Sequence, residues 1–122
     1  MGISNVPEPL RRRAEEAARQ PAIEVVRSFL GGHLADAETL DEVRNDLRRI
    51  AQTTVRGLRR DLAAIESILA EPAQPGVLAQ LVAWDANWVL DDASDAAAAV
   101  FLRRLADLLS EVIAERQADG QR

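Results

Sequence analysis

Apolar residues recur at steps of three and four along most of this chain, the spacing that places side chains on one face of an α-helix. The longest stripe predicts a single amphipathic helix over residues 40–70, roughly 45 Å long at the usual rise per residue. Thr39 precedes this stripe and Glu42 follows three residues later, which is the pattern of a capping box. The positions of the stripe are Leu40, Val43, Leu47, Ile50, Thr54, Leu58, Leu62, Ile65 and Leu69.

Two shorter helical patterns precede the long stripe. Residues 9–19 follow two prolines and carry oppositely charged side chains four positions apart, which predicts a solvated first helix. A second pattern carries Val26 and Phe29 on one side. It is predicted to end at Gly31 and Gly32, because helices commonly stop where glycine adopts a left-handed conformation.

Two further helices are predicted after the proline-rich segment 71–76, which is a clear break. The first covers residues 77–90 and the second covers residues from about 95 to 117, with Gly120 closing it. No stretch alternates apolar and polar residues as a strand does. The expected fold is all-α, an antiparallel bundle of four to five helices with the 40–70 helix at its centre.

The length of 122 residues suits one domain. We expect a flexible N-terminal tail at 1–8, a single helical-bundle domain at 9–118 and a C-terminal tail at 119–122. No stretch reaches the roughly 20 apolar residues of a membrane span, and the N-terminus lacks the signal-peptide pattern, so a cytoplasmic location without membrane contact is expected.

Composition excludes several kinds of chemistry. The chain has no cysteine and one histidine, which excludes disulfides, thiol catalysis, iron–sulfur clusters and cysteine-ligated zinc. All 15 positive charges are arginine, and the formal net charge is −5, which argues mildly against general nucleic-acid binding. We therefore expect no cofactor.

Trp84 and Trp88 form the first candidate site. Four residues apart on the predicted 77–90 helix, they share one face of it. The apolar arc of this helix is too wide for one contact, and Asp85 falls inside it. The simpler interpretation is that both tryptophans anchor the core. Because an unpaired buried carboxylate is costly, either an arginine pairs with Asp85 or the arc divides into a core face and a partner face.

Asp91, Asp92 and Asp95 form the second candidate site, in a region from 72 to 102 that holds no positive residue. Their DDxxD pattern resembles the metal motif of isoprenoid synthases, although the second metal motif of that family is missing. Small all-α nucleotide pyrophosphatases are closer in size, and the resemblance implies Mg²⁺ held by Asp92 and Asp95. The simpler interpretation is that these aspartates cap and solubilise a helix junction.

Arginines of the 40–70 segment form a basic stripe opposite the apolar one. Such a stripe can grip phosphates, but acidic residues are interspersed and no aromatic side chain lies among the arginines. His33, the single histidine, follows two glycines, and nothing in the sequence places an orienting carboxylate beside it. The stripe consists of Arg44, Arg48, Arg49, Arg56, Arg59 and Arg60.

These features favour a non-enzymatic helical module that binds another protein. A concrete version is an immunity or antitoxin-like protein that neutralises a basic effector through an acidic rim around an apolar anchor. A homodimer is also expected, because a long helix with a wide apolar arc often completes its core in a dimer. The alternatives are a Mg²⁺-dependent nucleotide or phosphate hydrolase using Asp92 and Asp95, and a nucleic-acid binder using the arginine stripe. The proposed partner surface is Trp84, Asp85, Trp88, Asp91, Asp92 and Asp95.

Overall fold

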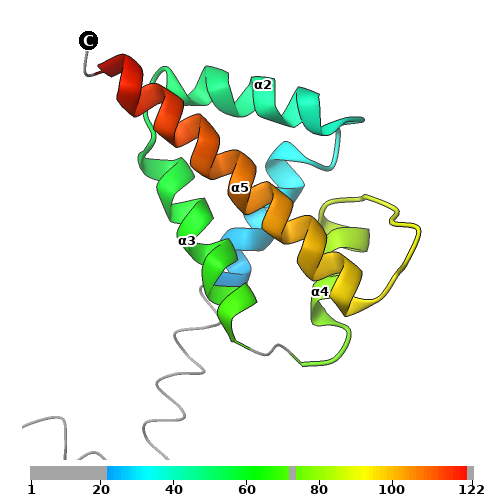
Figure 1. Cartoon of the computed structure of the whole chain (residues 1–122). Coiled ribbons are helices and arrows are strands. Elements are labelled where there is room, and N and C mark those ends of the chain that lie inside the picture. The colour runs from blue at the N-terminus through cyan, green and yellow to red at the C-terminus, as the bar shows by residue number, and fades with distance from the viewer. Residues whose placement is uncertain (1–21, 72–73, 121–122) are drawn as a thin grey trace, which may run out of the picture.

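Helix α5 (Asp95–Gly120) is the long helix against which the other elements pack, as the computed structural model in Figure 1 shows. The structure describes residues 22–71 and 74–120, so the expected tail at 1–8 and the predicted helix at 9–19 lie outside the described residues. Within the described ranges every regular element is a helix and no strand occurs, which confirms the all-α prediction. The predicted last helix is also present, and it extends to Gly120.

The predicted single helix over 40–70 is wrong, because the segment forms two helices, α2 (Leu40–Ala51) and α3 (Arg56–Ala70). At the end of α2 the amides of Gln52 and Thr53 donate to carbonyls three residues back, which tightens the last turn. The amide of Arg56 then donates to the side chain of Thr54 at 3.2 Å, in place of a helical bond. The apolar spacing continues through this turn because both helices bury their stripes against α5.

The capping box at the start of α2 is present in a modified form. The Thr39 hydroxyl accepts from the Glu42 amide at 3.2 Å, as predicted. The Glu42 carboxylate accepts from the amide of Glu38 at 2.8 Å, one residue before the cap. Both bonds satisfy backbone groups that would otherwise lack partners at the helix N-terminus.

The helix over residues 22–33 lies behind α5 in the view of Figure 1. Its predicted end at Gly31 and Gly32 is wrong, because both glycines are helical and neither has a positive φ. The chain leaves this helix through bonds from the amides of Leu34 and Ala35 to the carbonyl of Leu30. Leu30 and Leu34 are fully buried, so the turn is anchored in the core.

The predicted 77–90 helix ends early. α4 (Val77–Gln80) continues directly into a π-helical turn, η2 (Leu81–Asp85), and helical structure stops at Ala86. Asn87 then takes a positive φ of 55°, and residues 87–94 form a loop that returns to α5 (Figure 1). A residue in the left-handed conformation cannot continue a right-handed α-helix. The side chains after Ala86 therefore do not point in the directions that their helical spacing predicts.

One apolar core joins all these elements, with fully buried side chains from the 22–33 helix, α2, α3, η2 and α5. None of the helices in the described ranges combines the length and the apolar character needed to cross a bilayer. The largest fully buried side chains include Leu30, Leu47, Leu58, Ile65, Leu81, Leu102, Leu105 and Leu109.

Candidate functional site

The two tryptophans have opposite environments, contrary to the prediction that they share one helix face. Trp88 lies in the loop after Asn87, packed against Phe101 with ring centroids 5.1 Å apart. Its Nε1–H donates to the Leu34 carbonyl at 2.9 Å. Trp84, on the π-helical turn, is 77% exposed. Trp88 is therefore a structural side chain, and Trp84 is the one available to a partner.

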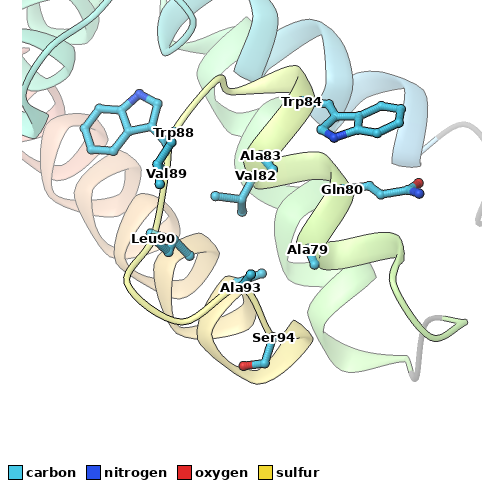
Figure 2. A pocket seen from close by; sticks show the side chains of 11 residues that line it. Ala79, Gln80, Val82, Ala83, Trp84, Trp88, Val89, Leu90, Ala93 and Ser94 are labelled. Atoms are coloured by element: carbon cyan, nitrogen blue, oxygen red, sulfur yellow. The ribbon is translucent and has the colours of Figure 1, made fainter.

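An apolar groove of about 280 Å³ lies between the α4–η2 helix and the loop that follows it. Figure 2 shows Val82 pointing from the helix toward this space, while Trp84 and Gln80 project from the outer side of the same helix. Val89, on the loop, is 98% exposed. Most of the remaining lining is small or apolar, consisting of Ala79, Ala83, Trp88, Leu90, Ala93, Ser94 and Ala98.

The sequence left open whether an arginine pairs with Asp85, and the structure places Arg27 near it. The Asp85 carboxylate lies 3.9 Å from Nε of Arg27, which comes from the 22–33 helix. The Asp85 side chain remains about one third exposed and that of Arg27 half exposed, so this is a loose surface pair. An internal arginine thus faces the carboxylate, and the neighbouring indole of Trp84 still points outward.

Asp92 and Asp95 act as caps, the simpler of the two interpretations. Asp95 accepts from the amides of Gly76 at 2.7 Å and Ala79 at 3.0 Å, and these bonds lower the pKa of its carboxyl. Asp92 accepts from the amide of Ser94 at 2.9 Å, and the Ser94 hydroxyl caps α5 by accepting from the Ala97 amide. The two carboxylates therefore hold the start of α4 and the start of α5.

No three acidic or histidine side chains in residues 22–71 and 74–118 gather closely enough to hold a metal ion. Asp91 is exposed beside the groove loop, and Asp92 is exposed next to it. Their charges, together with the absence of any cation from 72 to 102 in the sequence, leave this side of the molecule acidic. The Mg²⁺-dependent hydrolase using Asp92 and Asp95 stays a prediction, and this geometry does not favour it.

The basic stripe is divided by the turn between α2 and α3, and two of its α2 members, Arg44 and Arg48, pair with α5. Arg44 donates to Glu111 at 2.7 Å. Arg48 makes two bonds to Glu115, each 3.0 Å, which raise the pKa of the guanidinium and lower that of the carboxyl. These arginines therefore link α2 to α5 from side chain to side chain.

The other four arginines of the stripe differ in their contacts. Arg49 pairs with Asp46 within α2, and Arg60 lies 3.6 Å from Asp61. Within the described part of the chain no carboxylate forms an ion pair with Arg56 or Arg59. Only these two leave a full unpaired charge for a phosphate, which is a short segment of the predicted stripe.

His33 does have an orienting carboxylate, which the sequence alone did not indicate. Its Nδ1–H donates to Asp46 at 2.9 Å, and this bond lowers the pKa of the Asp46 carboxyl. Burial raises the pKa of Asp61 on α3, and the nearby charge of His33 acts in the opposite direction. The partners lie 13 and 28 positions apart along the chain, so only the fold brings them together.

A cluster of one histidine, two aspartates and two arginines thus lies where the turn after the 22–33 helix meets α2 and α3. The ring of His33 also contacts that of Phe29, with centroids 5.2 Å apart. Within this cluster, the bond from His33 to Asp46 links the 22–33 helix to α2.

Comparisons of the chain with family models, with curated proteins and with solved structures find no match. The residues themselves are therefore the only guide to function. Among them, the groove between α4–η2 and the 87–94 loop combines exposed apolar side chains with the exposed carboxylates of Asp91 and Asp92 on its loop.

Proposed function

We propose that the protein is a non-enzymatic protein-binding module whose docking surface is the groove between α4–η2 and the 87–94 loop, with Trp84 and Val89 at its rim. The observation that carries the proposal is the 77% exposure of Trp84, whose indole projects from the outer side of the helix that forms one wall of an apolar groove. Tryptophan is enriched among the few residues that dominate binding energy at protein interfaces. A large indole left in water here is best explained by a partner that covers it.

The size of the groove favours a protein partner over a small-molecule cofactor. Its volume of about 280 Å³ lies just below the range of roughly 300–1,000 Å³ in which small-molecule pockets fall. It is also open, between a helix and a loop (Figure 2). Such a space accepts one or two apolar side chains projecting from a larger surface, which is how interface anchors bind.

The charge around the groove selects a basic partner. Asp91 and Asp92 are exposed on the loop, and the sequence from 72 to 102 contains no arginine or lysine. Acidic charge speeds the encounter with a basic protein and repels acidic ones. An immunity or antitoxin-like protein that neutralises a basic effector is the concrete form of this proposal.

Self-association remains a prediction, but the reason for expecting it no longer holds. The expectation of a homodimer came from one long helix with an uncovered apolar arc. The segment instead forms α2 and α3, which bury their apolar faces against α5 within one copy. The groove beside Trp84 is the remaining apolar surface of note in the described residues, so any dimer is expected to compete with the partner for it.

The test is a comparative capture experiment with the purified chain as bait in an extract of its source cells. The double variant Trp84→Ala with Asp91→Arg is expected to lose a partner that the native chain retains. Val100→Ala is the matched control, because Val100 is also exposed, at 60%, and does not line the groove. The captured partner is then purified and titrated against all three proteins by calorimetry. Equal affinity for the native chain and the double variant would contradict the proposal.

A further inference from the structure

Among the described residues, Arg27 is the cation that forms an ion pair with Asp85, the residue that follows Trp84. Arg27 comes from the 22–33 helix and approaches Asp85 with Nε at 3.9 Å. This distance is an ion pair without a hydrogen bond, since N–H···O bonds fall at 2.7–3.2 Å. Asp85 therefore has a weakly held counter-ion.

Arg27 also has a second carboxylate within reach. Its NH1 lies 3.4 Å from Glu24, one turn earlier on the same helix. The guanidinium can leave Asp85 without losing every partner, because Glu24 continues to pair with it. The side chains of Arg27 and Glu24 are both at least half exposed, so no buried charge is created by the move.

Trp84 adjoins Asp85 on η2 and presents its indole to solvent. An indole face attracts a cation, and Arg is the side chain that most often occupies such a position. Trp84 and Asp85 are consecutive residues on η2, so we expect one long cationic side chain to reach both the carboxylate and the indole. Arg27 satisfies the charge, and the exposure of Trp84 shows that its stacking surface is largely uncovered.

We propose that Arg27 occupies the position that a cationic side chain of the partner takes in the complex. On binding, the partner's cation pairs with Asp85 and stacks on Trp84, while Arg27 turns to Glu24. This inference rests on the proposed function, and it specifies the partner's contact as a helical segment with an arginine or lysine next to an apolar side chain. The apolar side chain enters the groove, and the cation binds at its rim.

Charge complementarity decides in favour of this occupant over others. Nucleic acid and anionic lipid are repelled by the exposed carboxylates of Asp91 and Asp92, which no cation of the 72–102 segment offsets. A second copy of the chain would bring the same acidic surface and a net charge of −5. A basic segment alone finds opposite charge here.

The experiment measures binding of a fluorescein-labelled helical peptide of leucine, alanine and arginine by anisotropy. A second peptide carries citrulline, the uncharged analogue, at each arginine. Arg27→Gln is expected to tighten binding of the arginine peptide about two- to fivefold, the range that an exposed ion pair is worth. Asp85→Asn is expected to weaken it by a similar factor, and Trp84→Ala by about tenfold or more.

The matched control is Arg104→Gln, which changes the net charge by the same unit at an exposed position on α5 outside the groove. It separates release of Asp85 from a general increase in acidity, and it is expected to change the affinity less than Arg27→Gln. Glu24→Gln removes the alternative partner of Arg27 and is expected to weaken binding. Thermal unfolding of each variant confirms that it is folded.

The named results separate this inference from the proposed function. Equal affinity of native chain, Arg27→Gln and Arg104→Gln, with binding still lost in Trp84→Ala, overturns the role of Arg27 and leaves the docking surface in place. Equal affinity for the arginine and citrulline peptides, or no binding by the native chain and Arg27→Gln, also overturns the inference. A dimer in sedimentation that Trp84→Ala dissociates assigns the surface to a second copy and overturns it as well.

Discussion

The side of the molecule where α2 and α3 pack on α5 and the side formed by α4, η2 and the 87–94 loop are held by different kinds of contact. On the first side, side chains bind side chains across helices, as Arg44 binds Glu111 and Arg48 binds Glu115. On the second side, most of the polar contacts go to backbone groups, from the side chains of Asp92, Asp95 and Trp88.

Because of this difference, a loop can have a fixed backbone path while its apolar side chains stay accessible to a partner. Bonds to backbone amides fix the course of a loop without using the apolar side chains that the loop carries. Trp84 and Val89 therefore stay exposed on a segment whose path is nonetheless set. The α2–α3–α5 side, in contrast, buries its leucines and isoleucines and offers no comparable apolar surface among the described residues.

The largest effect that tests this comparison comes from a matched pair of apolar truncations. Leu102→Ala removes a fully buried side chain of α5 and is expected to cost about 2–5 kcal/mol of unfolding free energy. Val89→Ala, at a position 98% exposed, is expected to change it by less than about 0.5 kcal/mol. Urea unfolding followed by circular dichroism measures both, and a Val89→Ala loss of the Leu102→Ala size would show that the loop belongs to the core.

A smaller effect distinguishes the two tryptophans. Trp88→Phe keeps an aromatic ring against Phe101 but removes the bond from Nε1 to the Leu34 carbonyl. Because the Ala37 amide still donates to that carbonyl at 3.1 Å, the expected loss is about 1–2 kcal/mol and not that of an orphaned group.

Trp84→Phe is the counterpart, and its expected effect on the same unfolding measurement is within about 0.5 kcal/mol. If the two substitutions destabilise equally, the assignment of Trp88 to the frame and Trp84 to the surface is wrong. The same pair is expected to reverse its order in peptide binding, where Trp84 contributes more.

The smallest effect concerns pH and sharpens the description of the α2–α3 side. Burial raises the pKa of Asp61, so the folded state binds its proton more tightly than the unfolded state does. Stability is therefore lost as pH rises from the unfolded pKa of about 3.9 through the raised folded value. Asp61→Asn is expected to be more stable than the native chain at pH 7, by about 1 kcal/mol or less, and equal to it at pH 3.

The pKa of Asp46 is shifted in the opposite direction to that of Asp61. The bond from His33 lowers its pKa, so its contribution is present above the unfolded value and is lost as pH falls through the lowered one. Asp46→Asn is accordingly expected to reduce stability at pH 7. Urea midpoints from pH 3 to pH 8 for both variants measure the two signs, and a common sign would contradict this account.

The parts of the fold that the sequence predicts are those governed by local chemistry. Thr39 caps α2, the segment around Gly76 breaks the chain, and α5 begins at Asp95, each because of residues within a few positions. The break between α2 and α3 escapes prediction because apolar spacing reports only which face is buried. Both helices face α5, so the spacing continues unbroken through a real turn.

The candidate site divides in the same way. The acidic segment and the excessive width of the apolar arc follow from the sequence, but which of its side chains is exposed does not. The separation of Trp84 from Trp88 depends on one π-helical turn and on the positive φ of Asn87, and neither has a signal in the spacing. The pairing of His33 with Asp46 depends on where the 22–33 helix and α2 meet, which spacing does not encode.

The contrast between the two indoles also gives the protein a built-in optical reporter. Since the chain holds only two tryptophans and no tyrosine, its near-ultraviolet emission divides into a red component from the solvated ring and a blue component from the enclosed one. Covering of Trp84 by a partner shifts the first toward the blue, while loosening of the packing between Trp88 and Phe101 shifts the second toward the red. A single spectrum of the unlabelled chain thus distinguishes a bound state from a loosened one.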